Sequence, residues 1–333
     1  MDPVAALKQI ALFLERTGAP TQKVRAFRRA AQVVADLPRG EVETRAAAGT
    51  LTALPGIGNS TAKVIQESVA GGEPEYLTEL LAKAGGGPAV GGKELRAALK
   101  GDCHTHSDWS DGGSPIREMA EAAVKLGHEW MALTDHSPRL RVAHGLSADR
   151  LRRQLDVVAE LNAELAPFRI LTGIEVDILD DGALDQEPEL LDELDVVVAS
   201  VHSQLRMPRR EMTRRMVAAV SNPLVDVLGH CTGRLVTGKG RPESEFDPDE
   251  VFGACAEHGV AVEINARPER LDPPRRLLRR AVELGCDFAI DSDAHAPGQL
   301  HWQPYGCERA EECGVGPDRV INTRSADELL AGF

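Results

Sequence analysis

The most constraining feature of this 333-residue sequence is a pattern that repeats through residues 100–333. Each repeat begins with a short apolar or β-branched run and continues with a residue suited to metal binding or acid–base chemistry. Most repeats then enter a helical segment. The runs lie near residues 101–106, 130–134, 169–174, 195–201, 225–229, 261–262 and 287–290. Strands that alternate with helices predict a parallel sheet.

The helical segments between these runs are expected near residues 116–125, 148–165, 210–220 and 274–284. Polar residues at every carboxyl strand end are typical of a (β/α) barrel, because its loops gather at one mouth. An open doubly wound sheet needs functional residues only at its switch point. We therefore predict an α/β barrel of seven strands.

The first run contains three potential metal ligands, His104, His106 and Asp111, within eight positions. Residues two apart in an extended strand point to the same face, so the two histidines can bind one ion. Imidazole and carboxylate are ligands for zinc, manganese or iron. A His-x-His pair also occurs by chance in strands. The metal hypothesis therefore depends on the other strand ends.

Charge is distributed unevenly along the chain, whose net charge is −14. Residues 1–100 carry 13 Lys and Arg against 10 Asp and Glu, whereas the remainder carries 25 against 42. This balance argues against a surface that coats nucleic acid or membrane in general. The acidic excess of the body fits either cation binding or simple solubility.

The six cysteines form no Cys-x-x-Cys pair and suggest no disulfide framework. The sequence has no apolar run of about 18 residues and no signal-peptide layout at its N-terminus. We therefore expect a cytoplasmic protein without a membrane partner. The sequence makes no prediction of oligomeric state.

Two features of the first 92 residues suggest an anionic partner. Lys23, Arg25 and Arg28 crowd the start of an expected helix over residues 22–37, where cations oppose the helix dipole. A second feature is the turn at residues 54–58, which leads into a helix whose free N–H groups can bind an anion beside Lys63. The alternatives are a solvated basic face and an ordinary glycine-capped turn.

The sequence Leu-Pro-Gly-Ile-Gly of that turn, followed by Ala-Lys, resembles the helix-hairpin-helix motif. Together with the stretch at residues 24–31, it makes residues 1–81 similar to the lyase-type N-terminal domain of bacterial family-X DNA polymerases. The resemblance implies sequence-independent binding of DNA backbone phosphates. It points to Gly56, Ile57, Gly58, Lys63, Lys23, Arg25 and Arg28. It does not single out a lysine for lyase chemistry.

The motifs His-x-His, Thr-Asp-His-Ser, Gly-Ile-Glu-Val-Asp, Ser-Val-His-Ser, Leu-Gly-His and Ser-Asp-Ala-His follow in this order. The set resembles the PHP (polymerase and histidinol phosphatase) family. That resemblance implies a distorted seven-stranded (β/α), TIM-like barrel that holds up to three divalent ions of Zn, Mn or Fe. The implied ligands are His104, His106, Asp111, His136, Glu175, His202, His230, Asp293 and His295.

By the same resemblance, a first ion is bound by His104, His106, Glu175 and Asp293. Glu175 also bridges to a second ion with His202 and His230, and a third ion takes Asp111, His136 and His295. Asp111 stands where some family members have His, which leaves the metal of the third site open. We expect metal-activated hydroxide as the nucleophile, with Glu175, Asp293 and Arg267 closest to the chemistry.

These observations predict a helix-hairpin-helix DNA-binding domain at residues 1–84, a linker at 85–99 and a PHP phosphoesterase barrel at 100–333. The family-X polymerases carry a polymerase palm between two such parts, and it is missing here. The leading hypothesis is a 3′–5′ exonuclease or end-processing nuclease in DNA repair. The alternatives are a histidinol-phosphatase-like phosphomonoesterase on small molecules and a non-catalytic DNA-binding adaptor.

Overall fold

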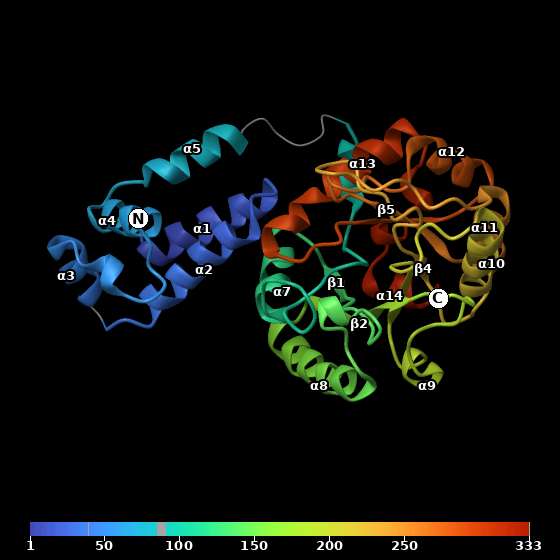
Figure 1. Ribbon diagram of the computed structural model, residues 1–333, viewed down its shortest axis with the longest axis horizontal. Coiled ribbons are helices and arrows are strands. Elements are labelled where there is room, and N and C mark those ends of the chain that lie inside the picture. Colours follow the sequence, from blue (N-terminus) through green and yellow to red (C-terminus); the bar gives the residue numbers. More distant parts are fainter. Residues whose placement is uncertain (39, 85–90, 333) are drawn as a thin grey trace. The chain divides into compact units, whose positions relative to one another are not determined.

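The computed structural model describes residues 1–38, 40–84 and 91–332, and the chain divides into two units after residue 87 (Figure 1). The predicted linker at residues 85–99 lies partly outside the described residues. Its described part contains α6 (Lys93–Ala98), whose Leu95 is buried in the core of the larger unit. Every helix in the described ranges is too short or too polar to serve as a transmembrane segment.

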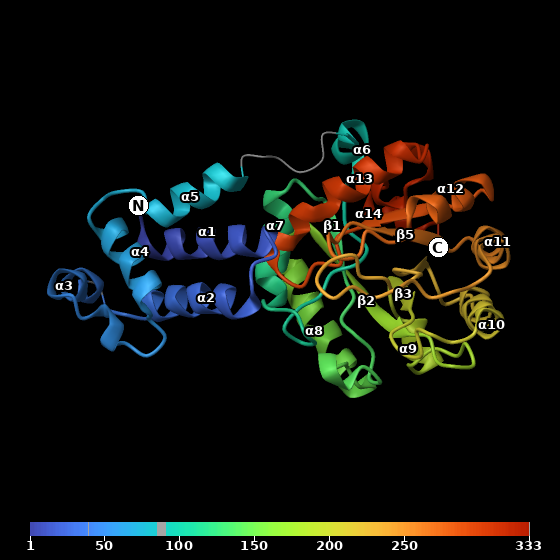
Figure 2. The same ribbon diagram turned by 45° about the horizontal axis from the view of Figure 1, so that its top comes forward.

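The smaller unit is all helical, as predicted. α1 and α2 lie side by side in it (Figure 2), and Phe27 of α2 stacks on Tyr76 with ring centroids 5.6 Å apart. Helix α1 begins at Pro3, where Asp2 caps it by accepting a hydrogen bond from the Ala5 amide at 2.7 Å. Its elements are α1 (Pro3–Arg16), α2 (Thr21–Ala35), α3 (Glu41–Ala48), the 3-10 turn η1 (Leu51–Ala53), α4 (Asn59–Val69) and α5 (Glu75–Ala84).

The larger unit is built on one six-stranded parallel sheet whose strands follow the order of the sequence. The strands are rich in Val, Ile and Ala and are largely buried, as parallel strands covered on both faces should be. They are β1 (Trp130–Leu133), β2 (Arg169–Asp177), β3 (Val196–Ser200), β4 (Val227–Leu228), β5 (Ala261–Asn265) and β6 (Phe288–Asp291).

Helices connect the strands and cover the outside of the sheet (Figure 1). The expected segments 116–125 and 148–165 are confirmed without change as α7 and α8, and the other two differ by a residue at their ends. The helices are α7 (Ile116–Lys125), α8 (Ala148–Leu165), α9 (Pro188–Leu191), α10 (Arg209–Val220), α11 (Pro248–His258), α12 (Arg275–Glu283), α13 (Gln303–Glu312) and α14 (Ala326–Leu330). The 3-10 turns are η2 (Arg141–Ala143), η3 (Pro297–Trp302), η4 (Pro317–Arg319) and η5 (Ile321–Thr323).

The barrel-type fold is confirmed, but the prediction of a strand at residues 101–106 is wrong. Thr105 forms only single parallel bridges, one to Leu133 at the end of β1 and one to Ala294 after β6. Two backbone amides of this segment donate hydrogen bonds to side chains and not to the backbone of a neighbouring strand. The Cys103 amide donates to Asp291 Oδ1 at 2.8 Å, and the Thr105 amide donates to a threonine hydroxyl. This segment therefore joins the two edges of the sheet without becoming a regular strand.

An apolar plug fills the sheet interior and fixes which strand residues reach the mouth. Its members include Leu171, Val198, Ala261 and Ala289 from four different strands. Because side chains alternate between faces, residues two or four positions further along each strand share the interior face. Glu175 and Glu263 occupy such positions within β2 and β5, and His202 and Asp293 follow two residues after the ends of β3 and β6.

Candidate metal centre

Glu175, near the end of β2, is the centre of the site and is 1% exposed. Five imidazoles from other segments surround its carboxylate, and the farthest of them is His106, whose Nε2 lies 3.6 Å from Oε2. His104 Nε2 lies 3.3 Å and His136 Nδ1 lies 2.8 Å from Oε2. His202 Nε2 lies 3.2 Å and His230 Nε2 lies 2.9 Å from Oε1. The carboxylate therefore has imidazoles on both oxygens.

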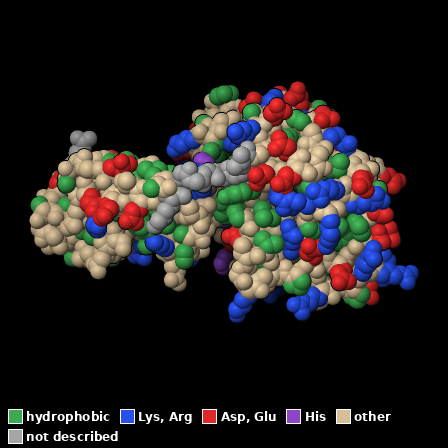
Figure 3. Space-filling view, turned by 90° about the horizontal axis from the view of Figure 1, so that it is seen from above, with side chains coloured by type: hydrophobic (Ala, Val, Ile, Leu, Met, Phe, Trp, Pro, Cys, Tyr) green, Lys and Arg blue, Asp and Glu red, His purple; other side chains and the backbone are tan. Residues whose placement is uncertain are grey.

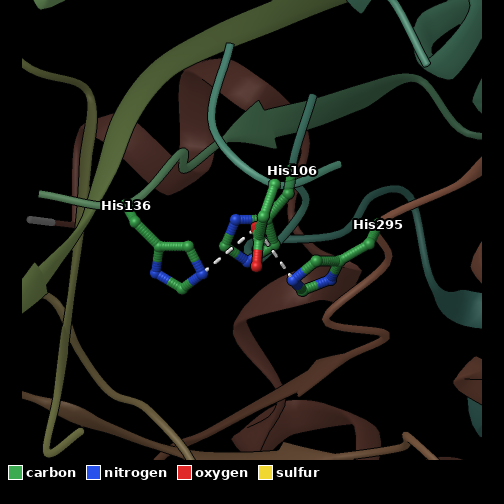
Figure 4. A group of neighbouring side chains, drawn as sticks. His106, His136 and His295 are labelled. Carbon is green, nitrogen blue, oxygen red and sulfur yellow. Dashed lines mark ion pairs between the residues drawn. The ribbon is translucent and has the colours of Figure 1, made fainter. Parts of the chain in front are cut away.

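A second group forms around Asp111, beside the first. The Oδ1 atom of Asp111 lies 3.4 Å from His136 Nε2 and 3.3 Å from His295 Nε2. Figure 4 shows the rings of His106, His136 and His295 gathered together, and those of His106 and His295 have centroids 4.1 Å apart. His106 Nε2 also lies 3.5 Å from Asp293 Oδ1. The structure thus brings all nine sequence-derived ligand candidates to one place.

The donor atoms lie close enough together to bind cations. Three groups each place their ligand atoms within 4.8 Å of one another: His106, Asp111, His136 and His295; His104, His106 and Glu175; and His136, Glu175 and His202. Several of these buried atoms have no hydrogen-bond partner among the described residues, including His104 Nε2, His106 Nε2 and Glu175 Oε2. Buried polar groups without partners are costly, so this donor set fits divalent metal binding.

Two carboxylates that were not among the ligand candidates orient two of the imidazoles by contacting their Nδ1 atoms. Glu263 Oε1 lies 2.6 Å from His104 Nδ1, and Asp177 Oδ1 lies 2.5 Å from His202 Nδ1. Each therefore turns the other ring nitrogen, Nε2, toward Glu175. The sequence carried a signal for both, since Asp177 is two residues after Glu175 and Glu263 ends an apolar run.

The charges of the site favour bound positive charge. Burial by itself lowers the pKa of His136, but Glu175 and Asp111 outweigh it and raise the pKa to about 10. Burial likewise opposes ionisation of Glu175, yet His202 and His104 hold the pKa of that carboxyl well below its usual range. Charges that hold protons on imidazole also attract metal cations.

Asp293 links the cluster of ligand candidates to two arginines. Its backbone has a φ of 52°, a left-handed conformation that is uncommon for residues other than glycine and clusters at functional sites. Its Oδ1 lies 3.5 Å from Arg267 Nη1, and its Oδ2 accepts a hydrogen bond from Arg270 Nε at 3.1 Å. Arg267 Nη1 is also 3.1 Å from His295 Nδ1. Arg267, singled out from the sequence, therefore lies against the ligand cluster.

A cavity of about 370 Å³ opens over this cluster. It is hereafter called the metal cavity. Its wall contains three arginines and four acidic residues. The arginines are Arg241, Arg267 and Arg270, and the acidic residues are Asp111, Glu175, Glu269 and Asp293. The remaining lining residues are His136, Leu140, His202, Leu235, Thr237 and His295. A substrate with negative charge can thus approach the ligands beside three guanidinium groups.

In the smaller unit, the turn at residues 54–58 has the expected form. Gly56 has a φ of 99°, and Gly58 caps α4, whose first-turn amides have no acceptor within the helix by geometry. The Gly58 amide itself donates to Thr61 Oγ1 at 2.9 Å. The Ile57 side chain is buried in the unit's core, so only its backbone is available to a ligand.

The basic residues expected to contact DNA have different surroundings. Lys63 lies 2.6 Å from Glu75, and Arg28 lies 2.7 Å from Glu15. Lys23 sits over the Tyr76 ring at 5.0 Å. Arg25 is exposed on α2. A phosphate partner must therefore compete with carboxylates at Lys63 and Arg28.

The sequence matches two known families. A helix-hairpin-helix domain family matches residues 1–74, and the PHP domain family matches residues 102–267. The DNA polymerase/3′-5′ exonuclease PolX of Bacillus subtilis (strain 168) is 42% identical over 233 residues. That match covers 70% of this chain, and the chain spans only 40% of the length of that protein.

Shorter relatives match over most of their own length. A probable phosphatase of Thermoanaerobacter sp. (strain X514) is 30% identical over 67% of this chain and 89% of its own length. A probable phosphatase of Caldanaerobacter subterraneus subsp. tengcongensis is 31% identical over 72% of this chain and 92% of its own length. With the metal-ligand geometry, these matches establish the chain as a member of the PHP family of phosphoesterases, joined to an N-terminal helix-hairpin-helix domain.

Proposed function

We propose that the chain hydrolyses phosphoester bonds at DNA ends, as a 3′–5′ exonuclease or 3′-phosphodiesterase. The observation that carries the proposal is the convergence of nine metal-ligand candidates on a cavity lined by three arginines. The helix-hairpin-helix match in the same chain supports DNA as the substrate. The 3′-5′ exonuclease named for the Bacillus relative supports the reaction.

Each group in the metal cavity has a defined part in this proposal. Glu175 and Asp293, with the histidines around them, hold up to three divalent ions of zinc, manganese or iron. Such ions, when bound, stabilise charge on phosphoryl oxygens and lower the pKa of water. Arg267 and Arg270 neutralise the phosphate and orient it, since a guanidinium can bind two oxygens at once.

The helix-hairpin-helix domain retains the DNA in this proposal. The first-turn amides of α4 and the exposed Arg25 are suited to backbone phosphates, which every DNA sequence shares. Binding through phosphates releases counterions, so the affinity for DNA should fall steeply as salt increases. The contact requires no particular base sequence.

A second candidate function is hydrolysis of a small phosphomonoester. Its support is that the Thermoanaerobacter and Caldanaerobacter relatives, both named probable phosphatases, match this chain over about nine-tenths of their own length. The metal cavity alone would serve such a substrate. A non-catalytic adaptor has weaker support, because the full ligand set is present.

The deciding experiment compares substrates in manganese buffer. The protein is incubated with a 3′-labelled duplex, a single strand, an abasic duplex and histidinol phosphate. Asp293→Ala, which removes a ligand, is assayed beside Glu189→Gln, an exposed substitution on α9. We expect release of nucleotides or 3′ phosphoester groups from DNA, lost in Asp293→Ala and retained in the control. Hydrolysis of histidinol phosphate alone would favour the second function.

A further inference from the structure

A second cavity, of about 630 Å³, adjoins the metal cavity. Four arginines line it, namely Arg209, Arg234, Arg241 and Arg276, and we call it the arginine pocket. Arg241 lines both cavities, so the two are neighbours across one segment of chain. The proposed hydrolysis of a single phosphoester uses the metal cavity and leaves this pocket without a role.

The wall between the cavities is a short hairpin. Leu235 and Arg241 pair across it through two backbone hydrogen bonds, at 3.0 and 2.9 Å. Successive side chains point to opposite faces of an extended segment. Leu235 and Thr237 accordingly line the metal cavity, whereas Arg234 and Val236 line the arginine pocket. A strand of substrate that passes over this wall would touch both cavities.

The guanidinium groups of the pocket are of two kinds. Arg234 is held in place, since its Nε donates to the Arg270 carbonyl at 3.0 Å and its side chain is 15% exposed. Arg209 and Arg276 lie toward solvent, with side chains 58% and 63% exposed, and pair with Asp247 and Glu243. Exposed ion pairs contribute little stability, so a phosphate can replace these carboxylates at small cost.

Carboxylates only partly cancel the positive charge of the pocket. Its lining contains four arginines and two acidic residues, Glu243 and Glu245, and Asp247 pairs with Arg209 from outside the lining. Charges of both signs lie on the face of the larger unit seen in Figure 3, whereas arginines outnumber acidic residues in the lining of this pocket. The excess favours an anionic ligand.

Apolar groups lie among these arginines. Val236 is 49% exposed, and Pro242 and Leu277 also line the pocket. Guanidinium planes and apolar side chains together suit the faces of a base and a sugar, while the guanidinium charge suits a phosphate. An inorganic phosphate or a small monoester would leave this apolar surface uncovered.

We propose that the arginine pocket binds a second nucleotide of a nucleic-acid strand whose scissile phosphate lies in the metal cavity. This inference rests on the proposed function, because it takes the substrate to be a strand. The pocket would distinguish a polynucleotide from a small phosphomonoester, which reaches only the metal cavity. Arg209 and Arg276 contribute affinity for the added phosphate, and Arg234 positions the wall.

Calorimetric titration of the full chain in manganese buffer tests this pocket directly. The ligands are thymidine 5′-monophosphate and the dinucleotide pTpT with a phosphorothioate link that slows hydrolysis. We expect the dinucleotide to bind about tenfold more tightly, as charge-assisted contacts to one more phosphate allow. The double variant Arg209→Ala/Arg276→Ala should lose this preference while binding the monophosphate as the wild type does, which also shows that it is folded.

The matched control is Arg117→Ala/Arg152→Ala, which removes two exposed arginines that also pair with single glutamates elsewhere on the barrel unit. It should keep the dinucleotide preference. Two results would overturn the proposal that the pocket binds a second nucleotide. One is equal affinity of the wild type for both ligands, and the other is a dinucleotide preference that persists in Arg209→Ala/Arg276→Ala. Cleavage of a labelled oligonucleotide by the wild type is scored separately. A dinucleotide preference without cleavage therefore supports the pocket and contradicts the proposed function.

Discussion

His104 Nδ1 lies 2.6 Å from Glu263 Oε1, and both side chains are fully buried. This contact directs His104 Nε2 toward Glu175. Glu263 therefore orients the ring of a ligand candidate although it does not line the metal cavity. We predict that Glu263→Gln weakens metal binding by about 10- to 100-fold, the usual effect of losing such a support. Competition with a metal-sensitive dye measures the affinity.

Asp177→Asn should act in the same direction, because Asp177 holds His202 as Glu263 holds His104. The exposed substitution Glu189→Gln provides the control and should leave metal affinity unchanged. If Glu263→Gln and Asp177→Asn both bind metal with an affinity within about twofold of the wild type, these carboxylates do not set the orientation of the imidazole rings.

Metal binding should release protons. The pKa of His136 is raised to about 10 because Glu175 and Asp111 outweigh its burial, so this imidazole is protonated at neutral pH before a cation binds. A metal ion must displace that proton, and its apparent affinity should rise as the pH rises toward 10. Titration calorimetry in two buffers of different ionisation enthalpy measures the release. Identical heats in the two buffers would refute the prediction.

Asp226 should make stability depend on pH. Burial raises its pKa to about 7, while its Oδ2 accepts a hydrogen bond from the Val197 amide at 2.7 Å. In the unfolded chain the carboxyl loses its proton near pH 4, so the native state binds more protons between about pH 4 and 7. The contribution of Asp226 to stability therefore falls as the pH rises through this range.

Asp226→Asn keeps the acceptor and removes the titration. We expect it to be more stable than the wild type at pH 8, by on the order of 2 kcal/mol after allowance for partial exposure, and nearly equal at pH 4.5. Urea unfolding followed by tryptophan fluorescence reports on the larger unit, which contains Trp109, Trp130 and Trp302. A stability difference that does not change with pH would count against the assignment.

The two glycines of the helix-hairpin-helix turn should respond differently to alanine. A Cβ at Gly56, where φ is 99°, would lie 2.7 Å from Arg29 Nε, whereas a Cβ at Gly58 meets nothing within 4 Å. Gly56→Ala should therefore destabilise the turn by about 1 kcal/mol or more, and Gly58→Ala should be nearly neutral. Hydrogen exchange in peptides covering residues 51–70 compares them. Equal effects would contradict the turn geometry.

Much of the larger unit follows from its sequence pattern. The runs that end in His136, Glu175 and His202 were recognisable because buried parallel strands are short, apolar and separated by helices. The segment around Thr105 was wrongly predicted as a strand, because its backbone amides bond to side chains from distant parts of the chain. The alternation of residue types along a short segment cannot reveal such partners.

Prediction of the site was more complete for ligands than for their surroundings. The ordered motifs indicated residues as far apart as His104 and His295, whereas the supporting contact between Glu263 and His104 depends on the closed sheet. The ion pair of Lys63 with Glu75 was also not evident, since it joins two helices across a turn. Spacing along the chain identifies residue types, but only packing assigns their partners.

The most direct test of the central claim is metal content. The full chain and Glu175→Gln are incubated with excess zinc or manganese, desalted, and assayed by inductively coupled plasma mass spectrometry. We predict about two or more ions per wild-type chain, and a clear loss in Glu175→Gln because this carboxylate lies against five imidazoles. A wild-type chain that retains no metal, or a variant that retains as much, would contradict the account.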